Sequence, residues 1–133
     1  MQAMIDATDL ERSIMALLLA EEHRALEVLR RQWREVKLAS REMSGVGSFL
    51  AIEVPASVPV LVSSRRLTLG DVVVDLPGRK DAIGAVLFVE GGALSMLELF
   101  TFDRPWPDDT SGFSVRYIRE PRVLSELDAV GLP

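Results

Sequence analysis

The 133-residue chain contains no cysteine and a single histidine, His23. The absence of thiols excludes structural disulfides, thiolate zinc sites and cysteine nucleophiles. One imidazole is too few for a typical histidine-rich metal centre, and no Asp-x-Asp-x-Asp-Gly calcium loop occurs. We therefore expect no metal site and no cofactor. His23 lies in a polar stretch, which predicts a surface or helix-capping residue.

Long apolar segments are also missing. The apolar run from Ile14 to Ala20 is far shorter than the roughly 20 residues that a membrane-spanning helix needs. The N-terminal stretch MQAMIDATDLERS is acidic, whereas a secretory signal begins with positive charge. These features predict a cytoplasmic protein without a membrane partner.

Positive charge is scarce as well. Fifteen basic residues stand against 20 acidic ones, for a net charge of −5, and no basic tail occurs. Nucleic-acid binding is therefore not expected. Neither pair of nearby glycines, Gly45 with Gly47 or Gly91 with Gly92, precedes the Gly-Lys-Ser/Thr of a phosphate loop, and no Gly-x-Ser-x-Gly elbow occurs. The sequence predicts turns at the glycines and no catalytic residue.

The N-terminal third has the apolar spacing of helices. Apolar residues recur three and four positions apart from Leu10 onward and again from Ala25 onward, and the polar stretch 21–24 interrupts them. Thr8 or Asp9 can cap the first turn. The pattern predicts two short helices, over residues 9–20 and 22–33.

Beyond Glu35 the pattern changes to the alternation that is typical of strands. Seven short strands and a final helix over residues 122–130 are predicted; the strands are 36–41, 49–54, 66–69, 72–76, 84–90, 93–102 and 113–119. Residues 1–133 are therefore expected to form a single α+β domain. In it, an N-terminal helix pair packs on an antiparallel meander of about five to seven strands.

The centre of this sheet is predicted at residues 84–102, where Gly91-Gly92 separates two apolar runs. Paired glycines favour a tight hairpin because they tolerate positive φ. In the second run one predicted face combines Leu94, Met96, Glu98, Phe100 and Phe102, and the other face is also apolar. This pattern predicts a strand covered on both sides. Glu98 must then find a partner, shift its pKa upward or reach solvent at the rim of the sheet.

Three residues are candidates for a binding site: Glu98, Trp106 and Arg41. Glu98 is either a functional carboxylate or a structural one that is paired with Arg116 or Arg41 or lies at a sheet edge, and the structural interpretation is favoured. Trp106, between Pro105 and Pro107, could anchor a partner, although an indole folded back as a lid on the core is favoured.

Residues 84–107 resemble a group of small bacterial proteins without a settled activity. The shared pattern is Gly-x-x-Leu-Phe-Val-Glu-x-Gly-x-x-Ser-x-Leu-Glu followed by Pro-Trp-Pro. The chain matches it at Gly84, Leu87, Phe88, Val89, Glu90, Gly92, Ser95, Leu97, Glu98, Pro105, Trp106 and Pro107. Residues 40–42 and 45–47 also resemble the first hairpin of that group. The resemblance implies no particular activity, but small acidic α+β proteins of this type also occur as immunity proteins beside bacterial toxins.

Together these features favour a non-catalytic protein-binding module, for example an immunity-type protein that covers a basic surface of its partner. The alternative is a small enzyme or ligand-binding domain that uses Glu98 and a second carboxylate in a pocket between helices and sheet. A third hypothesis is a domain that only associates with copies of itself as a homo-oligomer.

Overall fold

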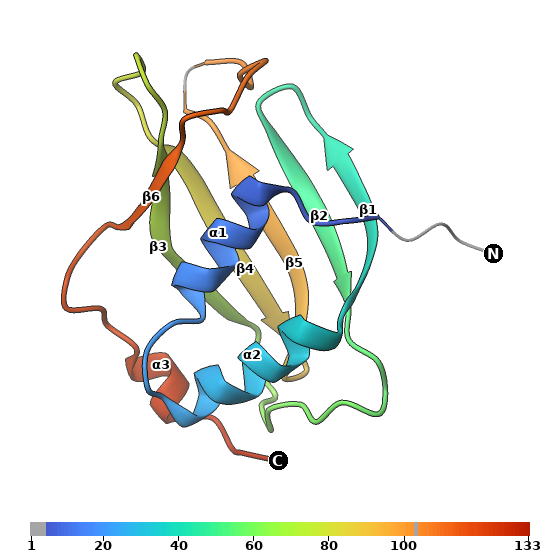
Figure 1. The fold of residues 1–133 in the computed structure, drawn as a ribbon. Coiled ribbons are helices and arrows are strands. Elements are labelled where there is room, and N and C mark those ends of the chain that lie inside the picture. Colours follow the sequence, from blue (N-terminus) through green and yellow to red (C-terminus); the bar gives the residue numbers. More distant parts are fainter. Residues whose placement is uncertain (1–4, 103) are drawn as a thin grey trace.

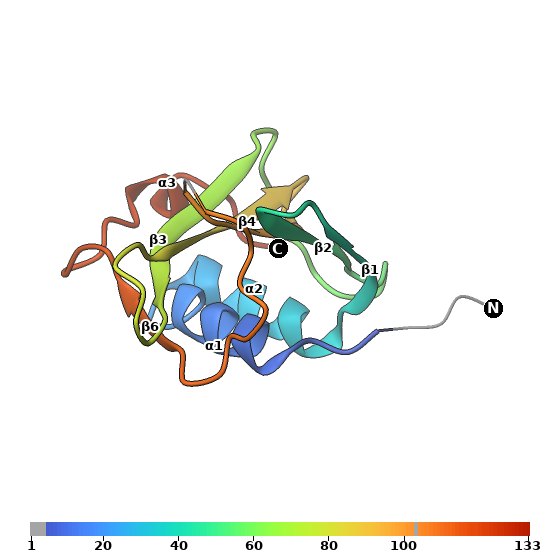
Figure 2. The ribbon, with the colours of Figure 1, turned by 90° about the horizontal axis from the view of Figure 1, so that it is seen from above.

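Two helices lie on one face of a six-stranded antiparallel sheet (Figures 1 and 2). The computed structural model describes residues 5–102 and 104–133, so the first four residues of the acidic N-terminal stretch lie outside it. The elements are α1 (Asp9–Leu18), α2 (Arg24–Glu35), β1 (Lys37–Met43), β2 (Gly47–Glu53), β3 (Leu67–Asp75), β4 (Ile83–Glu90), β5 (Ala93–Phe100), β6 (Ser114–Tyr117) and α3 (Ser125–Asp128). The predicted α+β class is confirmed.

The strands follow the order β1-β2-β5-β4-β3-β6, and every neighbouring pair is antiparallel. Only β3, β4 and β5 follow one another as in a meander. The β1–β2 hairpin joins the sheet through β2, beside β5, and β6 joins it beside β3. The sheet therefore departs from the simple meander that was predicted, because two of its connections pass over other strands.

The predicted break between the N-terminal helices is confirmed. Thr8 caps α1: its hydroxyl accepts a hydrogen bond from the Glu11 amide, and the Glu11 carboxylate accepts one from the Thr8 amide. The chain then turns at Glu21, whose φ is +90°. His23 caps α2 through Nδ1, which accepts a hydrogen bond from the Ala25 amide at 3.1 Å. The predicted capping role of His23 is thus also confirmed.

Two predicted elements differ in the structure. The short strands expected at 66–69 and 72–76 form the single strand β3, since Gly70 and Asp71 together oppose one residue of β4 and make a β-bulge. The final helix, expected at 122–130, comprises only α3. The side chain of Arg122 is bound instead to Asp71 at this bulge, outside any helix.

The central hairpin forms as predicted. Gly91 and Gly92 have φ values of +60° and +80°, the left-handed conformation that a two-residue hairpin turn requires. Gly92 also lies very close to the loop before β3, because a Cβ there would meet the Leu61 carbonyl oxygen at 1.7 Å. The second glycine is therefore needed for packing as well as for the turn.

A second bulge changes the faces of β5. Phe88 pairs with Met96 and Val89 pairs with Leu94, so Ser95 is an extra residue in β5. As a result Leu94 is buried on the helix side together with Leu97 and Leu99. The predicted face that combined Leu94 with Glu98 does not exist, and the prediction of a strand covered on both sides is wrong.

Candidate functional site

The helices α1 and α2 cover one face of the sheet and leave the other uncovered (Figure 2). Glu98, on the central strand β5, lies in the middle of this uncovered face. Phe49 on β2 and Val86 on β4 are its direct cross-strand neighbours. We define the open face by the partly exposed residues around this point: Phe49, Ala51, Val86, Phe88, Met96, Glu98 and Phe100. The alternation of side chains along each strand places all of them on the same side of the sheet.

The neighbours of Glu98 on the open face are all uncharged. Met96 and Phe100 lie two positions away along β5 in either direction, and the diagonal neighbours are Gly47, Ala51, Gly84 and Phe88. Among the described residues Glu98 makes neither a hydrogen bond nor an ion pair. Its carboxylate therefore has only uncharged direct neighbours, although Glu42 on β1 lies opposite Phe49 on the same face. Glu98 reaches solvent because neither α1 nor α2 covers this face.

Neither of the expected partners pairs with Glu98. Arg116 on β6 binds Asp75 of β3, with 2.6 Å between Nε and Oδ2. Arg41 on β1 binds Glu11 on the helix side of the sheet. The favoured structural interpretation of Glu98, a paired carboxylate, is contradicted for both arginines.

Two features mark the rim of the open face. At one end the guanidinium of Arg66 lies 4.2 Å from the centre of the Phe88 ring, and its Nε is 3.1 Å from Glu90. At the other end Phe102 is 55% exposed and meets the Phe100 ring edge to face at 5.4 Å. The apolar surface thus extends from Phe88 to Phe102, with Glu98 between them.

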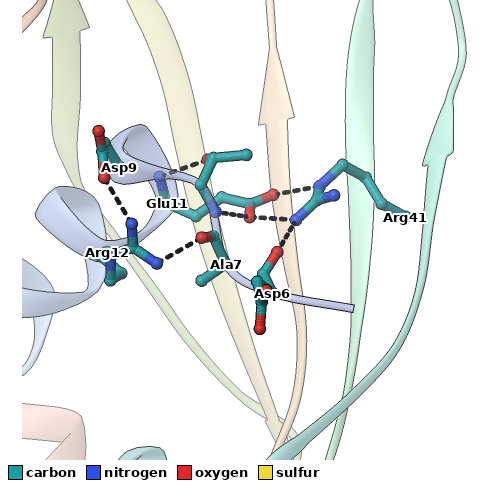
Figure 3. A network of polar contacts seen from close by, with 7 residues as sticks. Asp6, Ala7, Asp9, Glu11, Arg12 and Arg41 are labelled. Carbon is teal, nitrogen blue, oxygen red and sulfur yellow. Dashed lines mark hydrogen bonds and ion pairs between the residues drawn. The ribbon is translucent and has the colours of Figure 1, made fainter. Parts of the chain in front are cut away.

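Arg41 belongs to a different cluster, at the start of α1 (Figure 3). Its Nε and Nη2 donate hydrogen bonds to the two Glu11 oxygens at 2.8 and 2.6 Å, and Nη2 also donates to the Asp6 carbonyl at 2.9 Å. Glu11 is only 2% exposed. The hydrogen bond to Glu11 raises the pKa of Arg41 above its usual value. This pair therefore fastens the N-terminal segment and α1 to β1.

Trp106 packs on the same side of the sheet as Arg41. It is partly buried against the core, and its backbone amide donates a hydrogen bond to the Gly45 carbonyl at 2.7 Å. Together with Arg41, Glu11 and Ser48 it lines a cleft of about 220 Å³. Ligand pockets usually measure roughly 300–1,000 Å³. The structure thus brings Trp106 and Arg41 together and leaves Glu98 on the opposite face.

His23 has both ring nitrogens engaged. Nδ1 accepts the hydrogen bond from Ala25 described above, so Nε2 carries the proton and donates to Asp128 at 2.6 Å. No ring nitrogen is left to accept a proton from a substrate. His23 links α2 to α3 and offers no general base.

A larger groove, of about 610 Å³, runs between α2 and the C-terminal segment. Arg24, Glu27 and Arg31 of α2 line one wall, and Pro59 and Leu132 lie opposite. None of the three predicted binding residues contributes to it. The groove is therefore separate from both the open face and the Arg41 cleft.

Gln32 is a buried polar residue that the sequence analysis missed. Its amide nitrogen donates to the carbonyls of Pro59 and Gly92 at 3.2 and 3.0 Å, and its oxygen accepts from the Leu94 amide at 2.9 Å. It joins α2, the loop before β3 and the central hairpin. No sequence signal distinguishes it from the exposed polar residues of α2.

Arg122 was missed in the same way. Its buried guanidinium binds both carboxylate oxygens of Asp71, at 2.7 and 3.0 Å, and the carbonyls of Leu18 and Ala20 at the end of α1. It also lies 4.6 Å from the centre of the Tyr117 ring. All its hydrogen-bond partners lie within the fold, which indicates a structural role.

No protein-family model, curated protein or solved structure matches the chain. Within the described part of the chain, no helix combines the length and apolar character needed to cross a membrane. Within those same residues, no three histidine or acidic side chains are grouped as metal ligands would be.

Proposed function

We propose that this protein is a non-catalytic binding protein whose open face contacts another protein. The observation that carries the proposal is the carboxylate of Glu98, which lies among uncharged direct neighbours on an apolar sheet face. Contiguous exposed apolar patches mark interaction surfaces in many soluble proteins. A carboxylate buried in such an interface without a partner would be costly, so the contacting surface has to supply a cation.

The charge of the whole chain supports the same partner. A net charge of −5 attracts a basic surface and speeds its association. Binding by a face of this kind works by occlusion, since the sheet is already formed and simply covers its target. An immunity-type protein that covers a bacterial toxin is the specific role that we propose. The resemblance of residues 84–107 to a group of small bacterial proteins, and a cytoplasmic location, stay predictions within this proposal.

The alternative of a carboxylate-using enzyme receives less support. That hypothesis required Glu98 and a second carboxylate in a pocket between helices and sheet. Glu98 lies on the sheet face away from α1 and α2, and its neighbours there carry no charge. Among the described residues, no acidic or basic side chain lies beside it to share a proton.

A pull-down from an extract of the source organism tests the proposal with three baits: the natural chain, Glu98→Lys and Glu27→Lys. Both substitutions change the net charge by the same amount, but Glu27 is exposed on α2, on the other side of the sheet. We expect a partner that the natural chain and Glu27→Lys capture equally and that Glu98→Lys recovers at least about tenfold less, as loss of a buried charge pair predicts.

Equal recovery by all three baits would contradict the proposal, as would the absence of any specific partner. A toxin-like gene adjacent to this one would identify the first partner to purify and test. If the recovered protein binds the groove beside Arg24 instead, Glu27→Lys should weaken it and Glu98→Lys should not.

A further inference from the structure

We infer that the open face binds an arginine of the partner, with its guanidinium stacked on Phe49 and paired with the Glu98 carboxylate. The inference rests on the proposed function and specifies the chemistry of the contact. Three observations carry it: the register of Phe49 and Glu98, a similar contact elsewhere on the same face, and the absence of charge among the direct neighbours of Glu98.

The register places the two side chains within reach of one ligand. Phe49 and Glu98 are directly opposite each other in the antiparallel pair of β2 and β5. Residues opposed in this way have Cβ atoms roughly 4.5–5.5 Å apart and point to the same side. A planar guanidinium above the Phe49 ring can direct two N–H groups at the Glu98 carboxylate, which is the bidentate geometry that arginine favours.

The protein already contains such an arrangement on the same face. Arg66 lies over the ring of Phe88 at 4.2 Å while its Nε is 3.1 Å from Glu90. Phe88 on β4 and Phe49 on β2 flank β5 from its two sides. Phe88 is therefore contacted by an arginine of its own chain, which in turn pairs with a glutamate of the same chain. Phe49 lies between two glutamates, Glu98 on β5 and Glu42 on β1, and among the described residues no arginine stacks on its ring. The arginine is therefore the component that a partner can supply.

Arginine fits this place better than lysine. Its flat guanidinium combines ring stacking with two parallel hydrogen bonds, whereas an ammonium group is a more strongly hydrated point charge. The apolar side chains around Glu98 favour a weakly hydrated cation, since docking removes water from the pair. Partners without a cation must bury the carboxylate uncompensated, which makes the contact selective.

Charge also argues against two other occupants. A second copy of the chain, docked face to face about a twofold axis, would bring the two Glu98 carboxylates toward each other, and like charges oppose such contacts. A membrane surface of anionic lipids would meet both Glu98 and the chain's net charge of −5. The observations favour a protein segment with an arginine between apolar side chains.

The experiment uses the acetylated and amidated tripeptide Leu-Arg-Leu as the probe and Leu-Lys-Leu as its control. Backbone amide NMR signals of the full chain are followed during titration with each peptide. We expect the arginine peptide to shift the signals of Phe49, Val86 and Glu98, with a dissociation constant in the millimolar range, which corresponds to about −4 kcal/mol. The lysine peptide should bind at least about threefold more weakly.

Variants separate the two parts of the contact. Glu98→Gln should reduce binding of the arginine peptide at least about tenfold. Phe49→Leu should reduce it about twofold to fivefold, the effect of losing a partly exposed cation–π contact. Glu90→Gln, which changes only the Arg66 pair, should leave the affinity unchanged. The NMR spectrum of each variant reports whether it is folded.

Several results would overturn the inference: no shift at Phe49 and Glu98, equal binding of both peptides, or unchanged binding by Glu98→Gln. Other results distinguish a failure of this inference from a failure of the proposed function. If a captured partner depends on Glu98 while the arginine peptide does not bind, the open face is an interface without this arginine contact. If the peptide binds and no Glu98-dependent partner exists, the arginine contact at Phe49 and Glu98 is retained and the proposed function is wrong.

Discussion

Phe49 on β2 and Glu98 on β5 lie directly opposite each other on the sheet face that α1 and α2 leave uncovered. The carboxylate of Glu11 has the opposite environment: it is buried on the helix side of the sheet and bound by Arg41. The Glu98 carboxylate is thus part of the surface, whereas the Glu11 carboxylate is a buried part of the folded structure. Substitutions at the two positions should separate binding from stability.

Glu98→Gln should leave the fold intact. The free energy of unfolding should change by less than about 0.5 kcal/mol, the usual range for surface substitutions, because no described residue pairs with the carboxylate. Denaturant unfolding measures this change. A loss of more than about 1 kcal/mol would show that Glu98 has a structural partner, and the binding interpretation would then lose its basis.

Glu11→Gln should destabilise the protein strongly. The substitution leaves the Arg41 guanidinium without its carboxylate and weakens the capping contact to the Thr8 amide. Breaking a buried pair from one side costs about 3 kcal/mol in the free energy of unfolding. The same denaturant experiment measures it, with Glu98→Gln as the isosteric control on the other face.

The double variant Glu11→Gln with Arg41→Gln tests whether the unpaired Arg41 guanidinium causes this destabilisation. Since it leaves no unpaired charge, we expect its destabilisation to be at least about 1 kcal/mol less than the sum of the two single changes. Simple additivity would mean that Glu11 and Arg41 stabilise the fold independently, and the pair would lose the role assigned to it.

The two glycines of the central hairpin should respond differently to alanine. Gly91→Ala adds a Cβ in open space and should cost about 1–2 kcal/mol for the left-handed conformation alone. Gly92→Ala places a Cβ 1.7 Å from the Leu61 carbonyl and should cost about 3 kcal/mol or more. Thermal or denaturant unfolding distinguishes them, and equal costs would contradict the close packing at Gly92.

Tyr117 provides a pH-dependent prediction. Burial raises its pKa above the ordinary value of about 10, against the opposing charge of Arg122. Because the folded-state pKa is the higher one, its stabilising contribution is complete below pH ~10 and is lost as the pH rises through the folded pKa. Tyr117 is the only tyrosine. Absorbance of tyrosinate in the folded protein therefore reports its pKa directly.

Tyr117→Phe is the control for this titration. It should cost about 1 kcal/mol at neutral pH through loss of the hydrogen bond to the Leu17 carbonyl. The difference in stability between the natural chain and this variant should shrink above pH ~10. A tyrosine pKa at or below the ordinary value would contradict the burial of this hydroxyl.

The sequence predicted those elements whose geometry is determined by residues adjacent in the chain. Gly91-Gly92 predicted the hairpin because positive φ is a local requirement. The polar stretch at 21–24 predicted the helix break, since an amphipathic helix needs a continuous apolar stripe. The spacing from Thr8 to Glu11 matches a capping box and was a signal that could have identified Glu11 as structural.

The position of Glu98 could not be predicted in this way. The extra residue Ser95 moves Leu94 away from the face that Met96, Glu98 and Phe100 share, and such a bulge arises from the register with β4, which no pattern within β5 reveals. Arg122 and Gln32 likewise act on residues far along the chain, Asp71 and Gly92. Long-range polar contacts of this kind depend on the tertiary structure, so single-sequence patterns miss them.

The most direct test of the central claim is photo-cross-linking from the open face in cells of the source organism. A photoreactive amino acid replaces Met96, two residues from Glu98, and a second version carries it at the exposed Arg34 of α2. We predict that the photoreactive residue at position 96 forms an adduct with one specific protein. This adduct should disappear when the same chain also carries Glu98→Lys, and position 34 should form no such adduct. An adduct that forms equally from both positions, or that survives Glu98→Lys, would contradict the claim that this face and its carboxylate bind the partner.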